Sequence, residues 1–198
     1  MKNEFSLGQQ KAIMDQLFIP KFFQLSFDLW IDSNESRNTF KKILHITKGF
    51  SHGVCGARWP AIWLKPGDKL NFFHSFECLD STKRYGHRYS GNERLSAGEW
   101  HTISYQQIPI RNSSIAEMII SINGKISHKM TNRIPRRYDN MKAYYGLLPG
   151  ANESELEQSI HGKIKNFKLS ELMEGYSGTT FQSLIYKNDC SKDNNFNI

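Results

Sequence analysis

Apolar and polar residues alternate along several short stretches of this chain, which is the pattern of half-buried β-strands. The clearest stretch runs from Phe22 to Ile31, where positions 23, 25, 27, 29 and 31 are all apolar and the residues between them are mostly polar. Because side chains of a strand point alternately to its two faces, this stretch predicts a central strand with one face in the core. Almost no part of the chain has helical spacing.

Turn residues separate further strand-like stretches. Pro66-Gly67-Asp68 predicts a hairpin between residues 60–64 and 70–76, after a glycine-rich loop at 49–58, and a charged insertion is expected at 80–94. Other strands are expected at 43–47, 100–106, 141–146 and 160–169. Roughly nine to twelve strands without intervening helices predict an all-β fold, a sandwich of two antiparallel sheets.

Asn123-Gly124 within a β-prone run predicts a hairpin, since both residue types tolerate positive φ. A two-residue loop would pair Ile122 with Lys125. A three-residue loop would instead pair Ile120 with Ile126. We expect the second register, because it keeps apolar residues on one face.

Length and composition favour one domain. The chain has 198 residues, 38% of them apolar and 13% aromatic, which is enough for a core. We expect a domain over residues 1–170 and a polar tail over 171–198 that serves as a linker or interaction segment. No apolar run approaches the roughly 20 residues of a membrane span, so none is expected.

The chain is basic, with 26 Lys and Arg against 19 Asp and Glu, a net charge of +7. Such an excess attracts anionic partners. A solvated surface is the simpler explanation of this charge, and a patch for an anionic glycan or a lipid headgroup is the alternative. No nucleic acid is expected as a partner, because no recognition motif with interleaved aromatic residues is present.

Six segments occur in the order found in a known family. They are Phe-Gln-Leu-Ser-Phe-Asp-Leu-Trp, Ile-Leu-His-Ile, Pro-Ala-Ile-Trp-Leu with Leu-Asn-Phe, Gly-Glu-Trp-His-Thr-Ile, Ile-Ser-Ile-Asn-Gly-Lys, and a closing Gly-Lys-Ile-Lys-Asn-Phe-Lys-Leu. Over about residues 13–169 the chain resembles a laminin-G-like domain of the concanavalin A-like lectin/glucanase superfamily. The resemblance implies a curved two-sheet jelly roll, commonly extracellular, that binds glycans, proteins or lipids through its rim loops or concave face.

The residues do not predict an enzyme. Glucanases of this superfamily carry closely spaced carboxylates on one strand, and no such run exists here. Glu153, Glu155 and Glu157 lie in a loop-like acidic stretch and are expected to be solvated. Motifs for serine hydrolysis, zinc-dependent proteolysis and phosphate binding are also absent from the sequence.

Basic and aromatic residues in two loop-like segments are the candidate ligand-binding groups, because they combine planar donors, positive charge and rings. A flexible solvated loop remains the alternative for each segment. The first contains Arg84, Tyr85, His87, Arg88 and Tyr89, and the second contains Arg133, Arg136, Arg137 and Tyr138.

The four tryptophans divide between two expectations. Trp59 is a candidate platform for a ligand, and Trp30, Trp63 and Trp100 are expected in the core.

Metal binding and covalent modification have candidates as well. Asp68, Asp80 and Asp139 offer oxygen ligands for Ca²⁺, although ordinary turn formation is the simpler explanation of such residues, and no other cofactor is expected. Cys55 and Cys78 are spaced for a disulfide and Cys190 for an intermolecular one, with three free thiols in a cytosolic protein as the alternative. Glycosylation patterns occur at Asn34, Asn112 and Asn152, about as many as chance gives.

Together these observations lead us to expect a non-enzymatic binding or adhesion module that recognises a protein or an anionic glycan through rim loops. An extracellular or cell-surface location is expected, although no signal peptide is visible. A structural subunit of a multi-protein assembly is the first alternative, and a degenerate glycan hydrolase is the second.

Overall fold

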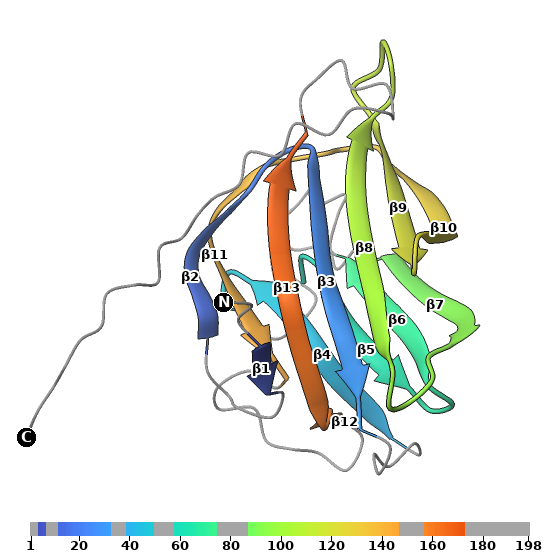
Figure 1. Ribbon diagram of the computed structural model, residues 1–198. Helices are drawn as coiled ribbons and strands as arrows, with labels where there is room; N and C mark the ends of the chain where they lie inside the picture. Colours follow the sequence, from blue (N-terminus) through green and yellow to red (C-terminus); the bar gives the residue numbers. More distant parts are fainter. Residues whose placement is uncertain are drawn as a thin grey trace, which may run out of the picture.

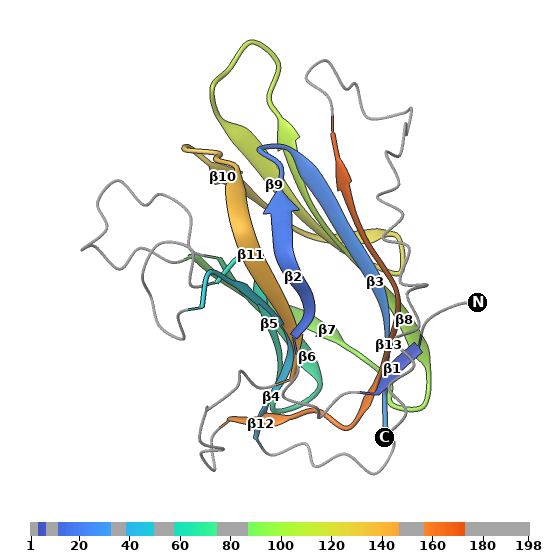
Figure 2. The ribbon, with the colours of Figure 1, turned by 90° about the vertical axis from the view of Figure 1, so that its left-hand side faces the viewer.

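The computed structural model describes residues 4–6, 12–32, 39–49, 58–74, 87–146 and 157–172, and these form two stacked antiparallel sheets (Figures 1 and 2). The six-stranded sheet has the order β1-β13-β3-β8-β9-β10. The seven-stranded sheet has the order β2-β11-β4-β5-β6-β7, with β12 paired to β4. The strands are β1 Glu4–Ser6, β2 Ala12–Ile19, β3 Phe23–Ile31, β4 Phe40–Thr47, β5 Ala61–Lys65, β6 Lys69–His74, β7 His87–Arg94, β8 Trp100–Pro109, β9 Ala116–Ile122, β10 Lys125–Asn132, β11 Tyr138–Tyr145, β12 Glu157–Ser159 and β13 Gly162–Glu171. The predicted all-β jelly-roll sandwich is confirmed.

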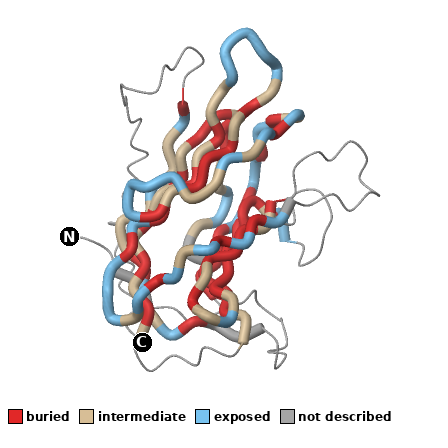
Figure 3. Tube along the Cα trace, turned by 90° about the vertical axis from the view of Figure 1, so that its right-hand side faces the viewer, coloured by how far each residue is buried: buried red, intermediate tan, exposed pale blue. Residues whose placement is uncertain are grey.

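Strand β3 is the central, half-buried strand that its alternating sequence predicts. It lies between β13 and β8, and its residues alternate between buried and partly buried along the whole strand. Its buried side chains pack on those of the opposite sheet, among them Ile62, Phe72 and Tyr145. Buried segments therefore lie along both layers, whereas residues 110–114, between β8 and β9, are exposed (Figure 3).

Strand β4 is buried on both of its faces. All residues from Lys41 to Thr47 are buried, although the strand contains two lysines and a histidine. It pairs with β5 on one side, with β11 on the other, and with β12 in parallel at its beginning. It therefore forms the interior of the seven-stranded sheet.

The predicted hairpin between β5 and β6 is present, with Asp68 at its turn. Asp68 has φ 62° and its carbonyl accepts a hydrogen bond from the Leu95 N–H at 2.9 Å. Residues 87–94 were expected within a charged insertion, but they form β7 at the edge of the sheet. That expectation was wrong because β6 offers these residues a pairing partner, which local composition does not reveal.

The Asn-Gly hairpin has the register that we did not expect. Ile122 pairs with Lys125, so the loop has two residues, and both Asn123 (φ 51°) and Gly124 (φ 79°) adopt the left-handed conformation. Our expectation rested on burying Ile126, but this side chain is 52% exposed. A register shift follows between Ile126 and His128.

Two hydrogen bonds hold this turn against the neighbouring strand β8. The Asn123 N–H donates to the Thr102 carbonyl at 2.8 Å, and the Thr102 N–H donates to Asn123 Oδ1 at 2.9 Å. Asn123 thus both forms the turn and bonds it to strand β8.

Two strands near the N-terminus were not predicted. β1 pairs with β13 and β2 pairs with β11, so each adds an edge to one sheet. The described ranges contain no helix long and apolar enough to cross a membrane.

Candidate ligand-binding face

Two aromatic side chains lie on the outer face of the seven-stranded sheet. Ile62 and Phe72 belong to the core, so their strand neighbours Trp63 and Phe73 point the other way. The rings of Trp63 and Phe73 meet edge to face, with centroids 4.7 Å apart and planes at 76°. This geometry suits the charge distribution of aromatic rings.

Three cationic side chains surround this aromatic pair. Lys42 Nζ lies 5.7 Å from the Trp63 ring centroid, and Arg58 Cζ lies 5.5 Å from Trp63 and 5.0 Å from Phe73. Arg88 Cζ lies 5.2 Å from the Phe73 centroid. All three are within the range of cation–π attraction. We call this group, with Phe40 beside Arg88, the cation–aromatic face.

Asn71 orients Arg88. The Arg88 Nε–H donates to Asn71 Oδ1 at 3.1 Å, and the Ser90 hydroxyl donates to the same oxygen at 2.9 Å. Asn71 is fully buried, so its amide is a fixed acceptor. Within the described ranges the terminal nitrogens of Arg88 have no partner, which leaves the planar end of the guanidinium available.

Exposure changes across this face. Trp63 and His45, whose ring centroids are 6.2 Å apart, are both buried. Arg88 and Ser90, on the edge strand β7, are exposed, and Phe73 is half-buried. A ligand can therefore reach the face at Arg88, and the half-buried rings of Phe40 and Phe73 support the Arg88 guanidinium.

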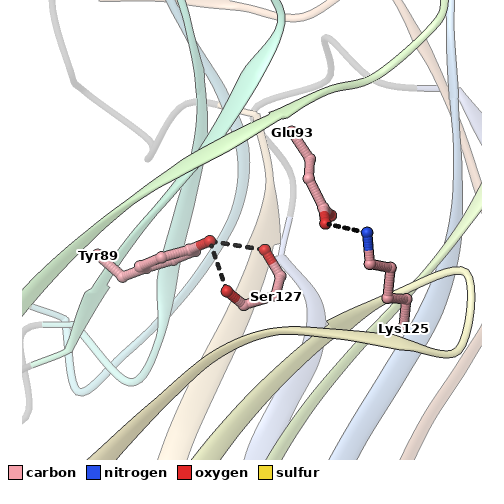
Figure 4. Close-up of polar contacts among 4 residues, drawn as sticks. All are labelled: Tyr89, Glu93, Lys125 and Ser127. Atoms are coloured by element: carbon pink, nitrogen blue, oxygen red, sulfur yellow. Dashed lines mark hydrogen bonds and ion pairs between the residues drawn. The ribbon is translucent and has the colours of Figure 1, made fainter.

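Tyr89 was a predicted ligand-binding residue, but it lies between the two sheets. Its hydroxyl is 2.6 Å from Ser127 Oγ, and its ring stacks on that of His128 with centroids 4.2 Å apart. Figure 4 shows the contact of Tyr89 with Ser127 beside the ion pair of Lys125 with Glu93, at 3.6 Å. Tyr89 joins β7 to β10, and its burial removes it from the candidate set.

Tyr138 is also a core residue rather than a ligand-binding one. Its ring centroid lies 4.5 Å from that of Trp59, and both residues are buried. Burial raises the pKa of the Tyr138 hydroxyl, an effect that the nearby Arg136 charge partly opposes. Trp59 is fully buried, so our expectation of a ligand platform there was wrong.

The other predicted members of the second basic segment are exposed. They lie in the connection between β10 and β11 and are Arg133, Arg136 and Arg137. Arg137 Nε is 3.9 Å from Asp139 Oδ2. The structure therefore brings none of them to the cation–aromatic face that the described contacts define. Arg84, Tyr85 and the side chain of His87 lie outside the described residues.

The candidate metal ligands are separated. Asp68 is in the β5–β6 turn. Asp139 was expected in a loop or turn, but it lies within strand β11. In the ranges that the structure describes, no three His, Cys, Asp or Glu side chains gather as a metal site would require.

The remaining candidates for metal binding or covalent modification fall mostly outside the described ranges. Asn112 is exposed between β8 and β9, so its glycosylation stays a prediction. Asp80, Cys55, Cys78, Cys190, Asn34 and Asn152 lie outside the described residues.

Sequence reasoning missed most of the cation–aromatic face. Trp63 is buried as expected, but it lies on the outer side of the sheet, and Arg58, Asn71 and Phe73 were not considered. The alternation of Ile62 and Leu64 with Trp63 gave a usable signal, since it assigns the tryptophan to the face opposite the aliphatic residues. Trp100, expected in the core, is 37% exposed, and Trp30 is only partly buried.

No protein-family model and no curated protein matches the sequence. Solved structures do match. The SAP-like pentraxin from Limulus polyphemus aligns with a TM-score of 0.53 and 13% identity, over 86% of this chain and 77% of the pentraxin. Endo-β-1,4-glucuronan lyase from Trichoderma reesei aligns with a TM-score of 0.54 and 11% identity, over 86% of this chain and 74% of the lyase. The chain has the fold of the concanavalin A-like lectin/glucanase superfamily.

Binding modules and enzymes both use this fold. The CBM40 domain of the Ruminococcus gnavus IT-sialidase, bound to α2,3-sialyllactose, aligns with a TM-score of 0.53 and 8% identity, over 87% of this chain and 91% of that domain. Identities this low establish the shared fold alone.

Proposed function

We propose that the protein is a non-catalytic binding module for acidic glycans, acting outside the cell or at its surface. The observation that carries this proposal is the arrangement of Arg88, whose Nε is fixed by Asn71 and whose guanidinium lies over Phe73 while its outer end is exposed.

A guanidinium held in this way suits a carboxylate. Its terminal N–H groups form a planar fork that matches the two carboxylate oxygens, and its orientation costs little further entropy because Asn71 already holds it. The half-buried Phe73 ring lies under this guanidinium and supports it by cation–π attraction. The combination favours a uronic or sialic acid over a neutral sugar.

The shared fold supports a glycan as the ligand, since the sialidase module with this fold binds sialyllactose. It also includes a glucuronan lyase, so an enzyme that cleaves acidic glycans is the competing function. Among the described residues of the same sheet, His45 and its register partner Tyr144 are two groups that could act as a base. Both are buried, and this burial favours binding without cleavage.

The test is titration calorimetry of the full chain with α2,3-sialyllactose and with polyglucuronate. Arg88→Ala should weaken binding about 10- to 100-fold, because a charged hydrogen bond contributes about 1.5–3 kcal/mol. Arg88→Lys should recover only part of the loss, since it restores the charge without the fork. Arg137→Ala, which removes an exposed arginine next to Asp139, is the matched control and should bind like the parent protein.

Three results would contradict the proposal. Equal affinity of Arg88→Ala and the parent protein would remove Arg88 from the site. Release of unsaturated sugars from polyglucuronate would show an enzyme. Association with a protein partner that is insensitive to salt, with no glycan bound, would favour the assembly subunit.

A further inference from the structure

The outer face of the six-stranded sheet carries a second group of aromatic and cationic side chains. Trp30 on β3 stands opposite Trp100 on β8, and Lys163 on β13 stands opposite Trp30 from the other side. Strands β13, β3 and β8 lie side by side in Figure 1. This face is on the side of the sandwich away from the seven-stranded sheet (Figure 2).

Each tryptophan holds a lysine over its ring. Lys165 Nζ lies 3.5 Å from the Trp100 ring centroid, and Lys163 Nζ lies 5.7 Å from the Trp30 centroid. Trp100 is 37% exposed, an unusual exposure for an indole. The indoles thus fix the positions of ammonium groups that long side chains otherwise leave variable.

Two carboxylate residues stand opposite Lys165 in the register, Glu4 on β1 and Asp28 on β3. The carboxylate of Asp28 is occupied by neutral donors. Its Oδ1 accepts from the Thr102 hydroxyl at 2.8 Å and its Oδ2 accepts from Asn166 Nδ2 at 2.5 Å. In the described part of the chain Lys165 forms no ion pair with a carboxylate. Its charge is directed to the Trp100 ring and to the surface.

Lys168 extends this pattern into a row. The shift in register after Lys165 places Lys168 opposite Ser26, so the three lysines of β13 face outward opposite successive outward residues of β3. Outward positions of a strand are about 7 Å apart, and the row therefore places three lysines along about 14 Å. A linear partner that carries repeated negative charges fits this spacing better than a single small anion.

We propose that this face, defined by Trp30, Trp100, Lys163, Lys165 and Lys168, is a second binding surface that takes a sulfated or carboxylated polysaccharide along β13. The capped indole of Trp100 disfavours single-stranded nucleic acid, whose bases need an open ring face. It disfavours a bilayer too, since the indole lies under an ammonium group. This surface is separate from the Arg88 site and does not depend on it.

The test uses the full chain carrying Arg88→Ala, so that the first site is removed, and dextran sulfate as the probe. The combined variant Lys163→Gln, Lys165→Gln and Lys168→Gln should lower the affinity at low salt about tenfold or more and reduce its salt dependence. Trp100→Ala should lower it several-fold, because Lys165 loses its support. The matched control Lys129→Gln removes an exposed lysine of the same sheet that pairs with Glu117, and should change the affinity less than about twofold.

Circular dichroism verifies the fold of each variant. The proposal is overturned if the combined variant binds dextran sulfate as tightly as the Lys129→Gln control. Equal or tighter binding of the parent protein to single-stranded DNA, or to vesicles containing phosphatidylserine, would show that the partner is of another class.

Discussion

At the scale of single residues, Gly162 has no room for a side chain. A Cβ placed there would lie well inside van der Waals contact with the Trp30 carbonyl oxygen, across the β13–β3 pair. Gly67 differs, since it has φ +83° and nothing within 4 Å of its Cβ position. Gly162 is therefore required because a side chain would not fit, whereas Gly67 is required because of its backbone conformation.

Gly162→Ala should destabilise the protein by about 2 kcal/mol or more, because two backbones must move apart. Gly67→Ala should cost about 1 kcal/mol, the penalty of a left-handed conformation for a residue with a Cβ. Urea unfolding of both variants measures the difference. A Gly162→Ala protein as stable as the parent would show that β13 does not approach β3 so closely.

At the scale of elements, the contact of β7 with β10 closes one side of the sandwich. His128 is one of its titratable groups, beside the ion pair of Lys125 with Glu93. Desolvation lowers the pKa of His128 below its usual 6.5, because its ring is stacked on Tyr89. The folded protein thus binds a proton there less readily than the unfolded chain. The stability that His128 contributes is present above about pH 6.5 and is lost as the pH falls through its folded pKa.

We expect the parent protein to lose more stability than His128→Gln when the pH is lowered from about 7.5 to about 5. The urea midpoints of the two proteins at both pH values provide the measurement. Comparison with the variant isolates His128 from the other histidines. Identical losses would show that the stacking does not disfavour the imidazolium form.

At the scale of the whole molecule, buried tyrosines make the stability of the folded protein depend on pH in the alkaline range. Burial raises the pKa of Tyr105, Tyr138 and Tyr145, so these hydroxyls stay neutral in the folded protein where the unfolded chain would ionise them. Their contribution to stability is complete below about pH 10 and is lost as the pH rises above it.

Alkaline unfolding should therefore coincide with the ionisation of these tyrosines. Phenolate absorbance after a rapid jump above pH 10 should show a fast phase from exposed tyrosines and a slow phase at the rate of unfolding. Tyr145→Phe should reduce the amplitude of the slow phase. A single fast phase from all tyrosines would contradict the described burial.

Much of this fold could be predicted from the sequence, because alternation reports directly on a strand with one buried face. β3, the β5–β6 hairpin and the position of the Asn-Gly turn follow from such local patterns. The register of that turn did not follow, since it depends on contacts with Thr102 in another strand. Strand β7 was missed for the same reason, because its pairing with β6 is not encoded in its own composition.

The candidate site was harder to predict than the fold. The sequence drew attention to charged and aromatic clusters, and Arg88 was among them, but proximity in the sequence grouped it with Tyr89, which points into the sandwich. Two partners of Arg88, Phe73 and Asn71, come from β6, 15 and 17 residues away, and Phe40 comes from β4, so only strand pairing brings them together. Trp100 was expected in the core, and its contact with Lys165 was not predicted, since the two residues meet across β3.

The double-sided burial of β4 has a consequence for the way the molecule opens. Its backbone is bonded to β5, β11 and β12, and its side chains are covered on both faces, so no local fluctuation at a sheet edge can expose it. Exchange of its amide hydrogens with deuterium must then wait for complete unfolding. The slowest-exchanging amides of the protein should accordingly lie in residues 41–47, where their protection equals the full free energy that separates the folded and unfolded chains.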